Sequence, residues 1–134
     1  MQPNWQQYGL AVLRILTGGL MAYHGWEVFH AAQMKDYAAW DQFKNWPAPL
    51  VMVYIGKGLE LVTGICFIIG AFTRIAALLM AVNMLTICFF IGNGQFYYAD
   101  QHPFLFAVLA LVYFFTGAGV WSLDSTLLKK RNHL

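Results

Sequence analysis

Residues 50–72 read LVMVYIGKGLELVTGICFIIGAF, an almost wholly apolar stretch that carries two charged residues, Lys57 and Glu60. A helix needs about 20 such residues to cross the hydrocarbon core of a bilayer, so this stretch is long enough. Ionisable side chains are rare in membrane helices and usually face the interior of a bundle, where they mark a relay, a pathway or a binding site. The stretch therefore predicts a membrane helix with a polar site near its middle.

Three further apolar segments accompany this one, and Gly-, Pro- and Asn-containing turns separate the four. The chain has 60% hydrophobic and 10% charged residues, whereas soluble domains have about 25% charged residues. We therefore predict one domain over residues 1–134, an all-α integral membrane bundle of four helices. The predicted spans cover residues 8–29, 50–72, 75–91 and 104–121.

Basic residues near span ends favour the cytoplasmic side of a membrane. Arg74 and residues 129–131 would lie on one side of the bilayer, and Lys35 and Lys44 would lie on the other side, balanced by acidic neighbours. This distribution predicts that the N- and C-termini are both cytoplasmic. The first segment follows no basic residue and contains Arg14, so we expect it to be retained rather than cleaved as a signal sequence.

The first outer loop, residues 33–49, contains aromatic residues at helical spacing, including Tyr37 and Trp40. This pattern predicts a short helix at the membrane interface, with Asp36 as its N-cap. Trp and Tyr side chains favour the level of the lipid headgroups. The loop would therefore either anchor the protein at a fixed depth or form a lid over an outward-facing pocket.

Polar residues from different segments are expected at comparable depths. With a rise of about 1.5 Å per residue, Arg14 would lie ~9 Å from the cytoplasmic end, Asn83 ~14 Å and Glu60 ~18 Å. On the same scale, Lys57 would lie ~22 Å and His24 ~24 Å from that end. We predict these five residues as a ligand-binding cluster and assign no catalytic residue.

Small residues predict where the first two spans meet. Gly56, Glu60 and Gly64 recur every four residues, and Gly18 and Ala22 have the same spacing. Small residues at this spacing allow two backbones to approach closely. We therefore expect the first and second spans to pack tightly, with Glu60 directed into their seam.

Two interpretations of Glu60 stay open at this stage. Glu60 either pairs with Arg14 or Lys57 as a buried ion pair that fixes packing, or takes part in binding a ligand or a proton. No metal site is predicted, because the histidine spacing matches no zinc pattern. A bis-histidine haem would need a second histidine at the depth of His24, and we expect His30 and His102 nearer the outer surface.

Several short pieces, in their order and spacing, resemble the DoxX family of membrane proteins over nearly the whole chain. The pieces are residues 14–18, His24-Gly25, Glu60 with Gly64, residues 70–77, and residues 115–119 followed by 122–124. The resemblance implies a four-span bundle in the bacterial inner (plasma) membrane. It also implies a link to quinone-reducing thiosulfate oxidoreductases and to membrane-bound thiol-stress complexes. Many relatives place a Lys shortly after His-Gly, where this chain has Glu27 and Val28.

The resemblance and the polar cluster together favour an accessory, non-catalytic subunit of a quinone- or thiol-linked oxidoreductase system. A quinone-like or lipid ligand would bind the cluster, no cofactor is firmly implied, and electrons would come from a partner protein. The alternative is a non-enzymatic lipid-binding or membrane-protein assembly factor; a transporter fits less well, because paired internal repeats are not evident. Expected partners are membrane lipids and other membrane or redox proteins, with a homo-oligomer as a further option and no nucleic acid.

Overall fold

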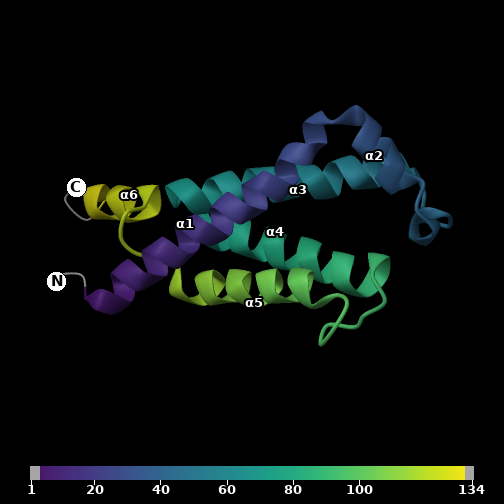
Figure 1. The fold of residues 1–134 in the computed structure, drawn as a ribbon. Coiled ribbons are helices and arrows are strands. Elements are labelled where there is room, and N and C mark those ends of the chain that lie inside the picture. The colour runs from purple at the N-terminus through teal and green to yellow at the C-terminus, as the bar shows by residue number, and fades with distance from the viewer. Residues whose placement is uncertain (1–3, 132–134) are drawn as a thin grey trace.

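The computed structural model describes residues 4–131, and the regular structure in that range is entirely helical. Figure 1 shows long helices packed side by side, with shorter helices at both ends of the bundle. In chain order the elements are α1 (Trp5–Gly25), η1 (Trp26–Phe29), α2 (Ala31–Ala38), η2 (Asp41–Phe43), α3 (Pro49–Ile69), α4 (Thr73–Thr86), the π-helical turn η3 (Ile87–Ile91), α5 (Gln101–Thr116) and α6 (Leu123–Arg131).

Local sequence signals account for the ends of the long helices. Asn4 caps α1, because its side-chain oxygen accepts a hydrogen bond from the amide of Gln7 at 3.1 Å. Pro49 opens α3, where its missing N–H costs no hydrogen bond. Gly70 ends α3 in the left-handed conformation, with φ of 66°. The turn predicted at 70–74 is therefore the tight connection between α3 and α4.

Asp124 caps a different helix from the one predicted. From the sequence alone, Asp124 is a candidate N-cap for a short segment over residues 125–130. In the structure its carboxylate instead accepts hydrogen bonds from the amides of Phe72 and Thr73 at 2.8 and 2.9 Å. It thus caps α4, where a negative charge also interacts favourably with the helix dipole. The role expected of Asp124 belongs to Ser122, whose hydroxyl accepts from the amide of Ser125 at 3.2 Å.

The interfacial segment contains the predicted short helix, but its beginning differs from the prediction. α2 begins at Ala31 after His30, so Asp36 lies inside the helix and is not its N-cap. The helix ends at Ala38, and the aromatic residues that follow lie on a turn and on η2. Residues 31–43 thus fold back over one end of the bundle (Figure 1).

The four long helices pack in neighbouring pairs. α1 packs against α3, α3 against α4, and α4 against α5 (Figure 1). α6 lies beyond the end of α3, at the same end of the bundle as the start of α1. Small and flexible side chains fill the core between α4 and α5. They include Ala76, Ala77, Met80, Ala107 and Ala110.

The close approach of α1 and α3 depends on glycine. A Cβ atom on Gly18 would lie 2.6 Å from the carbonyl oxygen of Gly64, and one on Gly64 would lie 2.5 Å from the amide nitrogen of Ala22. The predicted seam between the first two spans is confirmed at these positions. Gly56 does not belong to it, because a Cβ there would face Asn83 of α4 at 3.6 Å.

Two of the described helical segments are long and apolar enough to cross a membrane, namely Pro49–Ile69 and the continuous stretch Thr73–Ile91. α5 is a shorter apolar helix of 16 residues. α1 has 21 residues, the same length as α3. The arrangement of four spans and the orientation of the termini stay predictions.

The seam can be tested with two adjacent glycines. Replacing Gly18 with Ala forces the backbones of α1 and α3 apart, and overpacking of this kind costs about 1–3 kcal/mol. Gly19→Ala is the matched control, because no atom lies within 4 Å of a Cβ at that position. We expect thermal unfolding in detergent to show a lower Tm for Gly18→Ala and an equal or higher Tm for Gly19→Ala. Equal Tm values for both variants would contradict the close packing described above.

Candidate functional site

A cavity of about 450 Å³ lies near the end of the bundle that α2 covers. Helices α1, α3, α4 and α5 supply its walls, and four aromatic residues of the interfacial segment form its roof: Tyr37, Trp40, Phe43 and Trp46. Its polar lining residues are His24, Lys57, Glu60, Asn83, Thr86 and His102. We refer to this cavity as the roofed pocket. Residues of the outer loop line the cavity, and the choice between an anchor and a lid for this loop stays a prediction.

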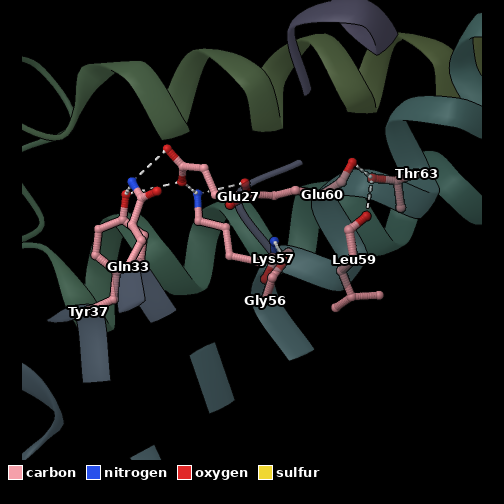
Figure 2. Close-up of polar contacts among 9 residues, drawn as sticks. Glu27, Gln33, Tyr37, Gly56, Lys57, Leu59, Glu60 and Thr63 are labelled. Atoms are coloured by element: carbon pink, nitrogen blue, oxygen red, sulfur yellow. Dashed lines mark hydrogen bonds and ion pairs between the residues drawn. The ribbon is translucent and has the colours of Figure 1, made fainter. Parts of the chain in front are cut away.

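Lys57 lies between two carboxylates at the edge of the roofed pocket. Its Nζ is 2.8 Å from Oε2 of Glu27 and 3.0 Å from Oε2 of Glu60 (Figure 2). The Glu60 side chain is 5% exposed and that of Lys57 is 17% exposed, so both charges are largely withdrawn from solvent. Lys57 and Glu60 are three residues apart on α3, as the helical spacing predicted. The pairing of Glu60 with Lys57 is therefore one of the two ion pairs expected from the sequence.

Glu27 connects this ion pair to the roof. Gln33 donates a hydrogen bond to Oε1 of Glu27 at 3.1 Å, and the hydroxyl of Tyr37 donates to Oε2 at 3.1 Å. Gln33 also donates to the hydroxyl oxygen of Tyr37 at 2.8 Å. The Nζ of Lys57 lies 5.5 Å from the centre of the Tyr37 ring, within cation–π range. The network in Figure 2 thus fastens α2 to α3 through η1.

Two groups of this network titrate outside the long helices. Partial burial would raise the pKa of Glu27, but the hydrogen bond and positive charge of Lys57 outweigh it and hold that pKa below its usual range. Burial, together with the bond to the Glu27 carboxylate, raises the pKa of the Tyr37 hydroxyl. At neutral pH Glu27 is therefore an anion that accepts hydrogen bonds, and Tyr37 is a neutral donor.

His24 of α1 and His102 of α5 meet at the wall of the pocket. Their ring centroids are 5.3 Å apart, with an angle of 69° between the ring planes. The expectation that no second histidine reaches the depth of His24 was wrong. α5 begins at Gln101, which places His102 in its first turn rather than in a loop. Within residues 4–131, no group of three or more His, Cys, Asp or Glu side chains is arranged to hold a metal ion.

Asn83 contributes to the pocket from α4. Its side-chain nitrogen donates to the carbonyl oxygen of Gly56 at 3.2 Å, which ties α4 to α3 beside the cavity. Gly56 also lines the cavity, so a larger side chain there would extend into the space. Four of the five residues predicted as a ligand-binding cluster therefore share one pocket: His24, Lys57, Glu60 and Asn83.

Arg14 does not join this cluster. Its side chain is fully buried at the other end of the α1–α3 seam, where its Nε donates to the carbonyl oxygen of Phe67 at 2.9 Å. Its other nitrogens donate to the carbonyls of Ala118, Val120 and Trp121. These carbonyls belong to the irregular segment between α5 and α6, which offers them no helical partners. Arg14 therefore secures that loop and makes no ion pair with Glu60.

The roofed pocket opens sideways, between α3 and α4. Its lining includes Ile55 of α3 and Leu79 and Val82 of α4. These residues are 53%, 43% and 57% exposed, so the cavity reaches the outer surface of the bundle between the two helices. The flanks of this opening are apolar. A molecule dissolved in a lipid phase could enter here without passing through water.

A second, wider cleft of about 910 Å³ lies at the opposite end, between the start of α4, the 117–121 loop and α6. Arg74 and Lys129 line it together with Tyr8 and Trp121. Arg74 and Lys129 are solvent-exposed, whereas the roofed pocket gathers withdrawn charges from several helices. Charges withdrawn from solvent are costly to maintain and mark functional sites more often than exposed ones. The roofed pocket is therefore the candidate site.

A family model described as DoxX matches residues 9–93, which is more than half of the chain. The chain belongs to the DoxX family. The matched segment contains most residues that line the roofed pocket, including His24, Lys57, Glu60 and Asn83, but ends before His102. DoxX proteins are associated with membranes, in agreement with the two membrane-length helical segments.

A relative of this DoxX protein occurs in Haemophilus influenzae (strain ATCC 51907 / DSM 11121 / KW20 / Rd), where its name is "Uncharacterized protein". The two chains are 29% identical, over 95% of this chain and 96% of the relative. No solved structure matches this DoxX chain. The comparisons thus establish the family but name no ligand.

Sequence reasoning about this DoxX chain missed three members of the site: Glu27, Tyr37 and His102. The sequence did contain an indication for Glu27. It lies three residues after His24, a spacing that places two side chains on the same face of a helix. Tyr37 lies four residues after Gln33, a spacing that brings two helical side chains together. His102 had no such signal, because its approach to His24 depends on how α5 packs.

The charge network predicts that removal of Lys57 lowers the stability of the protein far more than removal of an exposed lysine. Lys57→Met leaves two carboxylates, Glu27 and Glu60, without their cation, and loss of one partner from a buried ion pair costs about 3–5 kcal/mol. Lys44→Met is the matched control, because the exposed Lys44–Asp41 pair is worth about 0.2–1 kcal/mol. Chemical unfolding in detergent measures the free energy of unfolding of both variants.

A second substitution separates charge from packing in this experiment. If the loss arises from uncompensated negative charge, the double variant Lys57→Met/Glu60→Gln should recover part of the stability that Lys57→Met loses. A double variant as unstable as the sum of its single variants would show that the carboxylates do not depend on Lys57.

Proposed function

We propose that this DoxX protein is a multi-pass protein of the bacterial inner membrane that binds a quinone-like or lipid molecule in the roofed pocket. In this proposal α1, α3, α4 with η3, and α5 are the four spans, and α2 lies at the outer interface. The basic residues of α6 favour a cytoplasmic position for that helix and for the adjacent start of α1. The observation that carries the proposal is a withdrawn charge cluster at the edge of an apolar cavity that opens sideways.

Exposed apolar side chains support four spans rather than two. α1 exposes Leu13, Leu16 and Leu20 at 50%, 57% and 56%, and α5 exposes Leu105 and Val108. Soluble monomers rarely expose contiguous apolar surfaces of this extent. Lipid contact would cover the outward faces of α1 and α5 as well as those of α3 and α4.

The composition of the pocket supports an amphipathic ligand. Small-molecule sites are mostly apolar, with a few polar groups that fix the orientation of the ligand. The roofed pocket has that character, with aromatic residues above and Met21, Met84 and Phe106 along its walls. A polar ring or head group would lie near Glu60 and Asn83, and an apolar tail would leave between α3 and α4.

We further propose a role as an accessory, non-catalytic subunit of a quinone- or thiol-linked oxidoreductase system, and the polar groups of this pocket support it. The pocket supplies hydrogen-bonding and charged groups, and a partner protein would supply the electrons. The alternative is a non-enzymatic lipid-binding or assembly factor. The small-residue seam gives the assembly role little support, because Gly18 and Gly64 already face each other inside the chain.

Ligand binding is tested by extraction and titration of the purified protein. We expect mass spectrometry of organic extracts to detect a quinone or a specific lipid, and decylubiquinone to bind saturably to the protein in nanodiscs. Gly56→Leu fills the cavity and should weaken binding at least tenfold, a loss typical of an overpacked site. Gly58→Leu is the matched control, because nothing lies within 4 Å of a Cβ there. Equal binding by both variants, or no binding by the wild type, would refute the pocket as a ligand site.

The subunit role is tested separately by cross-linking in native membranes. We expect cross-links between this protein and a membrane-bound redox protein, recovered equally from the wild type and from Gly58→Leu. A protein that cross-links to lipid-synthesis or insertion machinery instead would favour the alternative. Recovery of the chain alone, or only with copies of itself, would contradict an accessory role.

A further inference from the structure

The charges around the roofed pocket do not balance. One ammonium group, that of Lys57, faces two carboxylates, those of Glu27 and Glu60, at 2.8 and 3.0 Å. The other titratable groups near them are the imidazoles of His24 and His102 and the hydroxyl of Tyr37. The ammonium group and the two carboxylates alone sum to one net negative charge. Arg14 does not offset this charge, because it bonds to carbonyls at the other end of the seam.

The two carboxylates differ in how fully their oxygens are used. Oε1 of Glu27 accepts a hydrogen bond from Gln33. Oε2 of Glu27 accepts a hydrogen bond from Tyr37 and pairs with Lys57. Glu60 uses Oε2 for Lys57, and none of the hydrogen bonds or ion pairs among residues 4–131 involves its Oε1. Glu60 also lines the cavity, whereas Glu27 lies behind Lys57. The cavity therefore contains a charged acceptor with unused capacity.

The remaining polar groups do not favour donors over acceptors. A neutral imidazole presents one donor and one acceptor, and the Asn83 amide presents both as well. His24, His102 and Asn83 can therefore pair with either a carbonyl or a hydroxyl of a ligand. Lys57 has three N–H donors; two face the carboxylates of Glu27 and Glu60, and its ammonium group also lies over the ring of Tyr37 at 5.5 Å, so little of its capacity is left for a ligand. Glu60 therefore determines whether a donating or an accepting head group binds more tightly, because hydrogen bonds to ionised groups are about twice as strong as those between neutral groups.

We propose that the roofed pocket prefers a ligand whose head group donates hydrogen bonds, and that it binds a hydroquinone more tightly than the corresponding quinone. A phenolic hydroxyl donates to Oε1 of Glu60, whereas a quinone carbonyl would place a second acceptor against that oxygen. This inference rests on the proposed function and names the form of the ligand that the pocket stabilises. Anionic head groups, such as phosphate or thiosulfate, are disfavoured by the same net charge.

The preference has a thermodynamic consequence for the bound couple. A site that binds the reduced form more tightly raises the midpoint potential of its ligand. For a two-electron couple, a tenfold ratio of dissociation constants corresponds to about 30 mV. The bound quinone is then easier to reduce than quinone in the bilayer, which suits a subunit that receives electrons from a partner and holds the product.

The experiment compares two redox forms of one ligand on the intact protein in nanodiscs. Decylubiquinol, kept reduced under argon, and decylubiquinone are titrated while fluorescence of the tryptophans, including Trp40 and Trp46 of the roof, is followed. We expect decylubiquinol to bind about tenfold more tightly than decylubiquinone. Equal affinities, or tighter binding of the quinone, would overturn the preference and leave the proposed function intact. If neither form binds, the proposed function itself fails.

Variants locate the source of the preference. Glu60→Gln replaces the charged acceptor with an amide that can both donate and accept, so the affinity ratio should fall to about one while decylubiquinone binding is retained. Asp36→Asn makes the same chemical change at an exposed position of α2 outside the pocket lining and should leave the ratio unchanged. A tenfold ratio that survives in Glu60→Gln would exclude Glu60 as its cause.

A further comparison needs no variant and therefore does not depend on whether Glu60→Gln folds. The dimethyl ether of decylubiquinol keeps the ring and tail but has no hydroxyl donors. The wild-type protein should bind decylubiquinol at least tenfold more tightly than this ether. An ether that binds as well as the hydroquinone would show that hydroxyl donation to the pocket plays no part.

Discussion

The close approach of α1 and α3 is the constraint on which the rest of the structure depends. Gly18, Gly25 and Gly64 remove the side chains that would hold the two backbones apart. Because Gly25 ends α1 directly against α3, the chain turns into η1 beside Lys57. This turn brings the Glu27 carboxylate to the ammonium group and places α2 over the cavity. The site is thus a consequence of helix packing rather than of a local motif.

The buried polar side chains at the two ends of the α1–α3 seam differ in how fully they are hydrogen-bonded. At one end Arg14 donates to four carbonyl groups of Phe67 and the 118–121 loop, so irregular backbone is satisfied where water is scarce. At the other end Glu60 keeps an unused oxygen beside a cavity. A fully paired cluster stabilises a fold, whereas a cluster with spare capacity retains the ability to bind. This contrast assigns Arg14 to structure and Glu60 to recognition.

Prediction from sequence succeeded where the physics is local to one helix or to one helix pair. The Lys57–Glu60 pair and the meeting of Gly18 with Gly64 follow from three- and four-residue spacings. It failed for Arg14, which was assigned to the cluster although its expected depth was ~9 Å and that of Glu60 ~18 Å. Helical side chains lean toward the N-terminus of their helix, which directs Arg14 away from Glu60 and toward the loop. It failed for His102 because helix packing, rather than spacing, decides which face of α5 meets α1.

The position of the lateral opening links the architecture to the type of ligand. Hydrogen bonds among Glu27, Gln33 and Tyr37 hold the roof in place, so aromatic rings and a hydrogen-bond network cover the α2 side of the pocket. The opening between α3 and α4 is flanked by exposed apolar residues, and one hydrogen bond, from Asn83 to Gly56, lies beside it. A ligand that reaches Glu60 by this route must partition into lipid and still carry a polar group to the charge cluster. A hydroquinone with an apolar tail meets both conditions, whereas a water-soluble anion meets neither.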